Sequence, residues 1–168
     1  MLPVIALIST LLTWPFGQPQ SVVRMTHLGA WRMSVRTDRF TGAVSCRLFK
    51  GSAFEPGVAY AHASLAFRFS PRLSTLDAVY RVDQGPARLW TSIYPSLVQL
   101  RAMPPAASLE NPTGGLVVLP MTELTAARTV TIRPSPDSQP KIFQVARIAD
   151  ALAQARALGC SSDDDFVR

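Results

Sequence analysis

The fold of this chain is decided by residues 30–49, AWRMSVRTDRFTGAVSCRLF. Every second residue from Trp31 to Val35 is apolar and the residues between them are polar or charged, which is the pattern of a half-buried strand. After a turn at 37–42, the same alternation returns around Cys46. The stretch therefore predicts a β-hairpin with Cys46 on its inward face.

Further short elements follow this hairpin. Apolar and β-branched runs bounded by turn residues predict strands at 58–69, 78–82, 87–90, 116–119, 129–132 and 141–145. The turn at 83–86 joins the second and third of these runs into a hairpin, with Gly85 able to adopt a positive φ. Residues 121–127 suit a short helix after Pro120, whereas 92–105 fit either a helix or a strand.

The clearest helix spans residues 146–158 and should pack on the sheet. One face of it carries apolar residues at helical spacing, namely Ile148, Ala149, Leu152 and Ala155. Gly159 ends the helix and Cys160 follows directly. A disulfide between Cys46 and Cys160 would join the helix end to the first hairpin and stabilise the chain by about 4 to 5 kcal/mol. Two free thiols in a reducing compartment are the alternative.

These elements predict an α+β fold, mainly an antiparallel sheet or β-sandwich, with the C-terminal helix packed on it. Hydrophobic residues make up 48% of the 168 residues and charged residues 17%, which is enough apolar content for a core. We expect a signal peptide or short membrane anchor at 1–20, a single β-rich domain at 21–160, and an acidic flexible tail at 161–168.

The first twenty residues contain no charged side chain. Their apolar run, 2–12, has the length of a signal-peptide core, whereas a spanning helix takes about 20 residues. We therefore expect a periplasmic or extracellular protein. No basic residue precedes the run and no A-x-A site follows it, so an uncleaved anchor with Trp14 and Phe16 at the membrane interface is the alternative. A third reading starts translation at Met25.

The rest of the chain is basic. The net charge is +6, and without the segment 161–168 the 16 basic residues outnumber the 8 acidic ones. A basic surface attracts anions, so we expect an anionic envelope surface or a membrane protein as partner. Arginines supply 15 of the 17 basic side chains and are scattered singly, so a solvated coat is the alternative. Nucleic acid is not expected, because no predicted strand carries paired aromatic residues.

No stretch of the sequence has the spacing of a catalytic or cofactor motif. His27 and His62 are the two histidines and neither lies in a metal-ligand spacing. There is no G-x-S-x-G pentapeptide, and the glycines at 114–115 lack the further glycines and lysine of a phosphate loop. We assign no catalytic, cofactor-binding or metal-binding residue and expect no cofactor. His62 reads as a strand residue with a hydrogen-bonded ring, and an envelope hydrolase that uses it or a carboxylate is an alternative.

Turn and core motifs carry a resemblance to known proteins. Trp31, the turn 38–42 with Cys46 after it, 80–86, 111–115 and the helix that ends at 159–160 look like a group of small, uncharacterised exported bacterial proteins. The order of short strands, late Ala-rich helix and cysteines is more remotely similar to the invasion-associated locus B family of periplasmic β-sandwich-like proteins. The resemblance covers about residues 30–160. It implies a fold and no catalytic residue.

Together these observations predict a non-catalytic exported envelope protein that acts as a binding or accessory module with a basic surface. The first alternative is a membrane-anchored accessory subunit of a larger membrane protein complex. The envelope hydrolase is the second.

Overall fold

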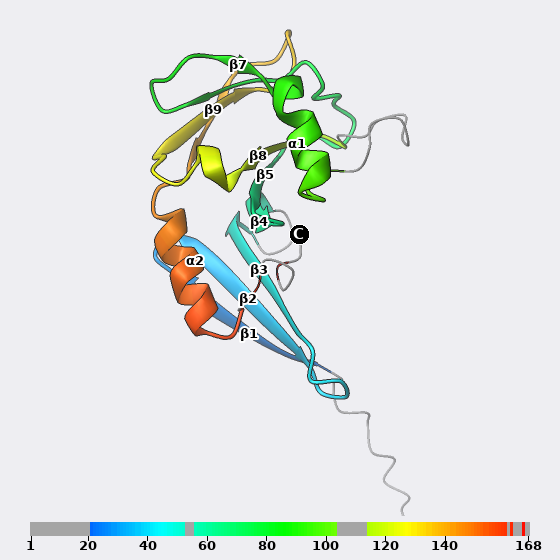
Figure 1. The fold of residues 1–168 in the computed structure, drawn as a ribbon, viewed down its shortest axis with the longest axis vertical. Helices are drawn as coiled ribbons and strands as arrows, with labels where there is room; N and C mark the ends of the chain where they lie inside the picture. The colour runs from blue at the N-terminus through cyan, green and yellow to red at the C-terminus, as the bar shows by residue number, and fades with distance from the viewer. Residues whose placement is uncertain (1–20, 53–55, 104–113, 161, 163–165, 167–168) are drawn as a thin grey trace, which may run out of the picture.

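The computed structural model describes residues 21–52, 56–103, 114–160, 162 and 166. These residues form two antiparallel sheets with a helix near the C-terminus, as expected for the predicted α+β class (Figure 1). The expectations for residues 1–20, with Trp14 and Phe16, lie outside the described residues.

The larger sheet has the strand order β1-β2-β3-β4-β5-β8. Its strands are β1 (Ser21–Leu28), β2 (Trp31–Asp38), β3 (Val44–Gly51), β4 (Pro56–Ala61), β5 (Ser64–Arg68) and β8 (Leu116–Pro120). The hairpin expected at 30–49 is confirmed as β2 and β3, and its register places Val35 opposite Cys46. The first five strands are neighbours in sequence order, so each hairpin positions the next.

The smaller sheet has the order β10-β9-β6-β7. Its strands are β6 (Val79–Val82), β7 (Arg88–Leu89), β9 (Thr129–Arg133) and β10 (Lys141–Gln144). The expected hairpin at 78–90 is present as β6 and β7. The positive φ in its turn belongs to Asp83, at 48°, and not to Gly85. Asp83 tolerates this backbone because its carboxylate accepts the N–H groups of Arg128 and Thr129.

Two strand predictions need correction. Residues 58–69 do not form one strand, because His62 and Ala63 both have a positive φ and make the tight turn between β4 and β5. His62 is therefore a turn residue and not the expected strand residue. The pattern also missed β1, whose apolar residues Val23 and Met25 are exposed while Arg24 and Thr26 share a face with the inward residues of β2.

Within the described ranges, the helices are few and short. They are the 3₁₀ turns η1 (Trp90–Ile93) and η3 (Met121–Glu123) and the α-helices α1 (Tyr94–Gln99) and α2 (Ile148–Ala157). Thus the segment left open at 92–105 begins as a helix, and the helix expected at 121–127 is a single 3₁₀ turn. The prediction of α2 is confirmed, although its buried face contains Ala151 in place of the exposed Ala149.

Helix α2 covers the inward face of β2, and the outer face of β1 to β3 lies on the other side of the sheet (Figure 1). Trp31 points inward, is fully buried, and donates a hydrogen bond from Nε1 to the carbonyl oxygen of Ala146 at 3.3 Å. The buried residues of both sheets, α1 and α2 form one cluster. The two faces of the first three strands therefore differ, since the inward face supplies the residues of this cluster, whereas Phe49 is buried on the outer face and lies outside it.

The predicted disulfide between Cys46 and Cys160 is present, with a Cα–Cα distance of 6.2 Å. Both cysteines are fully buried. Phe166 forms an isolated parallel bridge with Cys46, and its ring meets Tyr60 edge-on at 4.9 Å between centroids. Phe166 is therefore packed, unlike the flexible tail that the sequence suggests for 161–168.

Reduction of this disulfide should lower the free energy of unfolding by about 4 to 5 kcal/mol, because the bond closes a loop of 114 residues. We expect denaturant unfolding of the oxidised protein to have a higher midpoint than that of the reduced protein or of a C46A/C160A variant. Equal midpoints, with the thiols quantified as free after reduction, would contradict this role.

Candidate anion-binding face

Three arginines of β2 and β3 lie on the outer face of the larger sheet. Cross-strand partners share a face, and the register places Arg47 opposite Ser34, between Arg32 and Arg36. Diagonal neighbours of this kind have Cβ atoms about 7 to 8 Å apart. His27 of β1 lies opposite Arg32 and adds an imidazole ring to this side. We call His27, Arg32, Arg36 and Arg47 the basic strand face.

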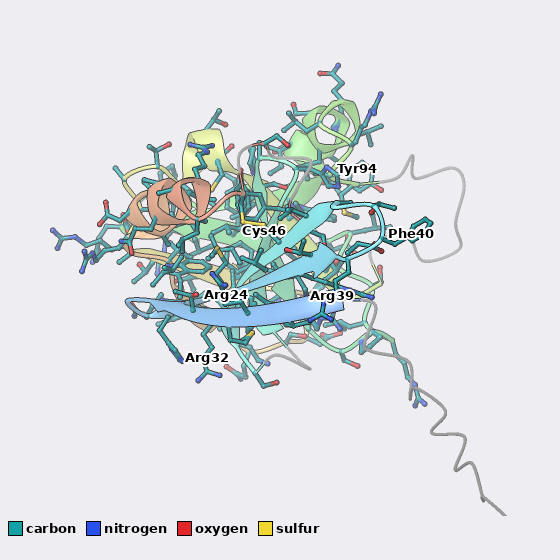
Figure 2. The ribbon with its side chains drawn as sticks, turned by 90° about the horizontal axis from the view of Figure 1, so that it is seen from below. Arg24, Arg32, Arg39, Phe40, Cys46 and Tyr94 are labelled. Carbon is teal, nitrogen blue, oxygen red and sulfur yellow. A yellow bond between two sulfur atoms is a disulfide. The ribbon has the colours of Figure 1, made fainter. Side chains whose placement is uncertain are left out.

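The three arginines of this face differ in exposure. Arg32 and Arg36 are exposed, whereas Arg47 is half-buried and its guanidinium lies 5.9 Å from the centroid of the Phe49 ring. Figure 2 shows Arg32 projecting away from the sheet. Because Arg47 lies within one Debye length, about 8 to 10 Å, of both Arg32 and Arg36, the fields of neighbouring arginines add at the surface.

The hairpin tip between β2 and β3 is a preformed turn. One carboxylate oxygen of Asp38 accepts hydrogen bonds from the backbone N–H groups of Phe40, at 2.8 Å, and Thr41, at 2.9 Å. The Asp38 carbonyl oxygen accepts the N–H of Gly42, which has a φ of 72°. The N–H groups of Thr41 and Phe40 lower the pKa of Asp38, so its carboxylate stays charged and keeps the turn closed at neutral pH.

This turn presents Phe40 to solvent. The Phe40 side chain is 94% exposed, and Figure 2 shows it pointing away from the body with Arg39 on the same hairpin. Ser21 of β1 pairs with Asp38, so the chain passes from residue 20 into the sheet beside this tip. The tip lies at the end of the molecule opposite the smaller sheet (Figure 1).

A second polar cluster lies by the smaller sheet, in a cavity of about 320 Å³. The Tyr80 hydroxyl donates a hydrogen bond to Oε2 of Glu123 at 2.8 Å, and Nη1 of Arg88 lies 3.6 Å from the same oxygen. Burial and the bond to Glu123 raise the pKa of Tyr80 to about 12. The phenol is therefore neutral at physiological pH and is no base. The cluster joins β6, β7 and η3, which is a structural role.

A smaller cavity of about 180 Å³ opens on the inward side of the sheet, where β1 to β3 extend past the end of α2. Its apolar walls are formed by Val35, Val44 and Leu158, and Arg24 also lines it. It brings together no group with acid, base or nucleophile chemistry.

The residues considered for catalysis are not assembled into a site. His62 lines neither of these two cavities, and its positive φ of 48° places it in the turn between β4 and β5. Within the part of the chain that the structure describes, no three His, Cys, Asp or Glu side chains gather as metal ligands. Cys46 and Cys160 are bonded to each other. The basic strand face was not predicted, because its arginines are spaced irregularly in sequence and only the strand register brings them together.

The disulfide suggests a non-cytoplasmic compartment, since such bonds persist where thiols oxidise. Among the described residues, none of the helices has the length and apolar composition needed to cross a bilayer. Neither a protein-family model, nor a curated protein, nor a solved structure matches this chain. The function is therefore inferred from the geometry of its own side chains.

A Tyr80→Phe substitution tests the structural role of the second cluster. Loss of the hydrogen bond to Glu123 should lower the free energy of unfolding by about 0.5 to 1.5 kcal/mol at neutral pH. The raised pKa of Tyr80 favours the protonated phenol in the folded state, so its contribution is present below pH 10 and is lost as the pH rises through about 12. Stability of the variant should fall less steeply between pH 10 and 12. Parallel alkaline profiles of the two proteins would exclude this linkage.

Proposed function

We propose that this protein is a non-catalytic exported envelope protein, periplasmic or extracellular, that acts as a binding module for anionic surfaces. The basic strand face is the binding surface. The observation that carries the proposal is the strand register, which gathers Arg32, Arg36 and Arg47 on the side of the sheet that α2 does not cover.

The side chains of this face suit phosphate and carboxylate groups. Guanidinium groups bind such oxyanions through two parallel N–H bonds and stay charged at all physiological pH values. The acidic residue within β1 to β3 is Asp38, at the strand end, and its carboxylate accepts the N–H groups of the turn. The field around the exposed Arg32 and Arg36 is therefore positive and attracts anions.

The expected ligands are phosphate groups of lipids or other polyanions of the envelope. A Lys or Arg near an anionic membrane contributes about 1 kcal/mol to binding. Three arginines then supply about 3 kcal/mol, which gives weak, reversible and salt-sensitive attachment. This affinity suits a module that binds a surface reversibly and exchanges between bound and free states.

A membrane-anchored accessory subunit is the second candidate. The observation in its favour is the position of Ser21 beside the hairpin tip, because a retained apolar segment 1–20 would bring that end of the sheet to the membrane. The intact mass of the protein from its native compartment separates the two cases. A full-length mass favours the anchor, and a mass lacking about 20 residues excludes it.

Charge removal on the face tests the proposal. A R32Q/R36Q/R47Q variant should bind phosphatidylglycerol vesicles, or a soluble polyphosphate, about 100-fold more weakly, as three contributions of about 1 kcal/mol imply. Co-sedimentation measures binding to the vesicles, and isothermal titration calorimetry measures binding to the polyphosphate. The affinity of the wild-type protein for both anionic ligands should fall with added salt. The wild-type protein should not bind phosphatidylcholine vesicles.

The matched control removes three arginines elsewhere. R72Q/R81Q/R133Q carries the same net charge, and its exposed positions lie in β6, in β9 and in the loop after β5. It should keep most of the affinity. Equal loss in both variants would mean that net charge acts and the basic strand face does not, which would overturn the proposal.

A further inference from the structure

We infer that the binding surface is a docking site for an anionic phospholipid bilayer, and that Phe40 at the hairpin tip inserts into its interface while the basic strand face binds phosphate groups. The inference rests on the proposed function and narrows it, because polyanions that form no bilayer offer nothing for Phe40 to enter.

The exposure of Phe40 is the first step. Its side chain is 94% exposed and packs in no part of the core, although a phenyl ring is normally among the buried residues. Single exposed apolar residues are common, so exposure alone assigns no role. Phe40 differs because it occupies the apex of a projecting hairpin, with Arg39 next to it in sequence.

The second step is the rigidity of the turn. The carboxylate of Asp38 holds the N–H groups of Phe40 and Thr41, and a pair of backbone bonds joins Asp38 to Gly42 and Ala43. The apex is therefore ordered before it meets a surface. A preformed apolar tip loses little conformational entropy on insertion.

The third step is the chemistry around the tip. Arg36 lies two residues before the turn on the outer face, and Val23, its cross-strand partner on β1, is 58% exposed. An aromatic ring with arginines behind it matches the order of a bilayer surface, in which phosphates lie outside the acyl chains. The charge complementarity selects an anionic bilayer, because a protein partner would offer no layered arrangement of this kind.

The fourth step is direction. Ser21 pairs with Asp38, so the chain leads from residues 1–20 into the sheet at the same end as Phe40. With Phe40 inserted, an attached molecule would have its smaller sheet directed away from the bilayer (Figure 1).

A single introduced tryptophan reports insertion. Trp31 and Trp90 are fully buried, and a Trp14→Phe background removes the third tryptophan of the sequence, so Phe40→Trp supplies a distinct exposed signal. We expect its fluorescence to shift to shorter wavelength on phosphatidylglycerol-containing vesicles and to be quenched by lipids brominated on their acyl chains. The control Ile142→Trp, on the 67% exposed position of β10, should bind the same vesicles without either change.

A Phe40→Ser variant should bind these vesicles about tenfold more weakly, with unchanged binding of soluble polyphosphate and an unchanged near-ultraviolet circular dichroism spectrum. Vesicle binding that depends on the arginines but leaves Phe40→Trp unquenched would overturn the inference and leave the proposed function standing. Absence of binding to both vesicles and polyphosphate would overturn both. A dimer in solution that Phe40→Ser converts to a monomer would show that a second copy covers the tip, and would also overturn the inference.

Discussion

The covalent bond between Cys46 and Cys160 is the constraint that holds helix α2 on the larger sheet. It fixes the end of α2 to the inward side of β3, where Phe166 also packs against Tyr60. Because α2 then covers the inward face, the apolar side chains of β2 and β3 on that face are withdrawn from water, whereas the outer face carries Arg32, Arg36 and Arg47 beside the buried Phe49. The asymmetry between a core face and a basic face follows from this attachment.

The two polar regions of the molecule use charge in opposite ways. Near the smaller sheet, the Glu123 carboxylate accepts a hydrogen bond from the Tyr80 hydroxyl and forms an ion pair with the Arg88 guanidinium. The charge of Glu123 is therefore compensated within the fold. On the outer face of β2 and β3, arginines are adjacent to one another and the nearby carboxylate of Asp38 serves the turn. Like charges directly opposite each other destabilise a sheet, and the register avoids this by placing Arg47 opposite Ser34 and Arg36 opposite Ser45.

The sequence predicts those parts of the fold in which side-chain periodicity and burial agree. The hairpin at 30–49, the helix α2 and the disulfide follow from alternation, helical spacing and the two cysteines. Strand β1 was missed because its inward positions hold Arg24 and Thr26. The turn between β4 and β5 was missed because His62 and Ala63 carry none of the usual turn signals. The basic strand face could not be predicted, since no sequence spacing specifies which arginines the register will bring together.

The order of strands in the larger sheet bears on how the chain acquires its covalent bond. Strands β1 to β5 pair only with sequence neighbours until β8 joins, so the contacts of this part are local and form rapidly. As the chain is synthesised from its N-terminus, this meander can therefore form before Cys160 is available to pair with Cys46. With two cysteines in the whole sequence, oxidation within one molecule has a single product. Maturation then needs an oxidant and no step that reshuffles wrongly paired sulfurs.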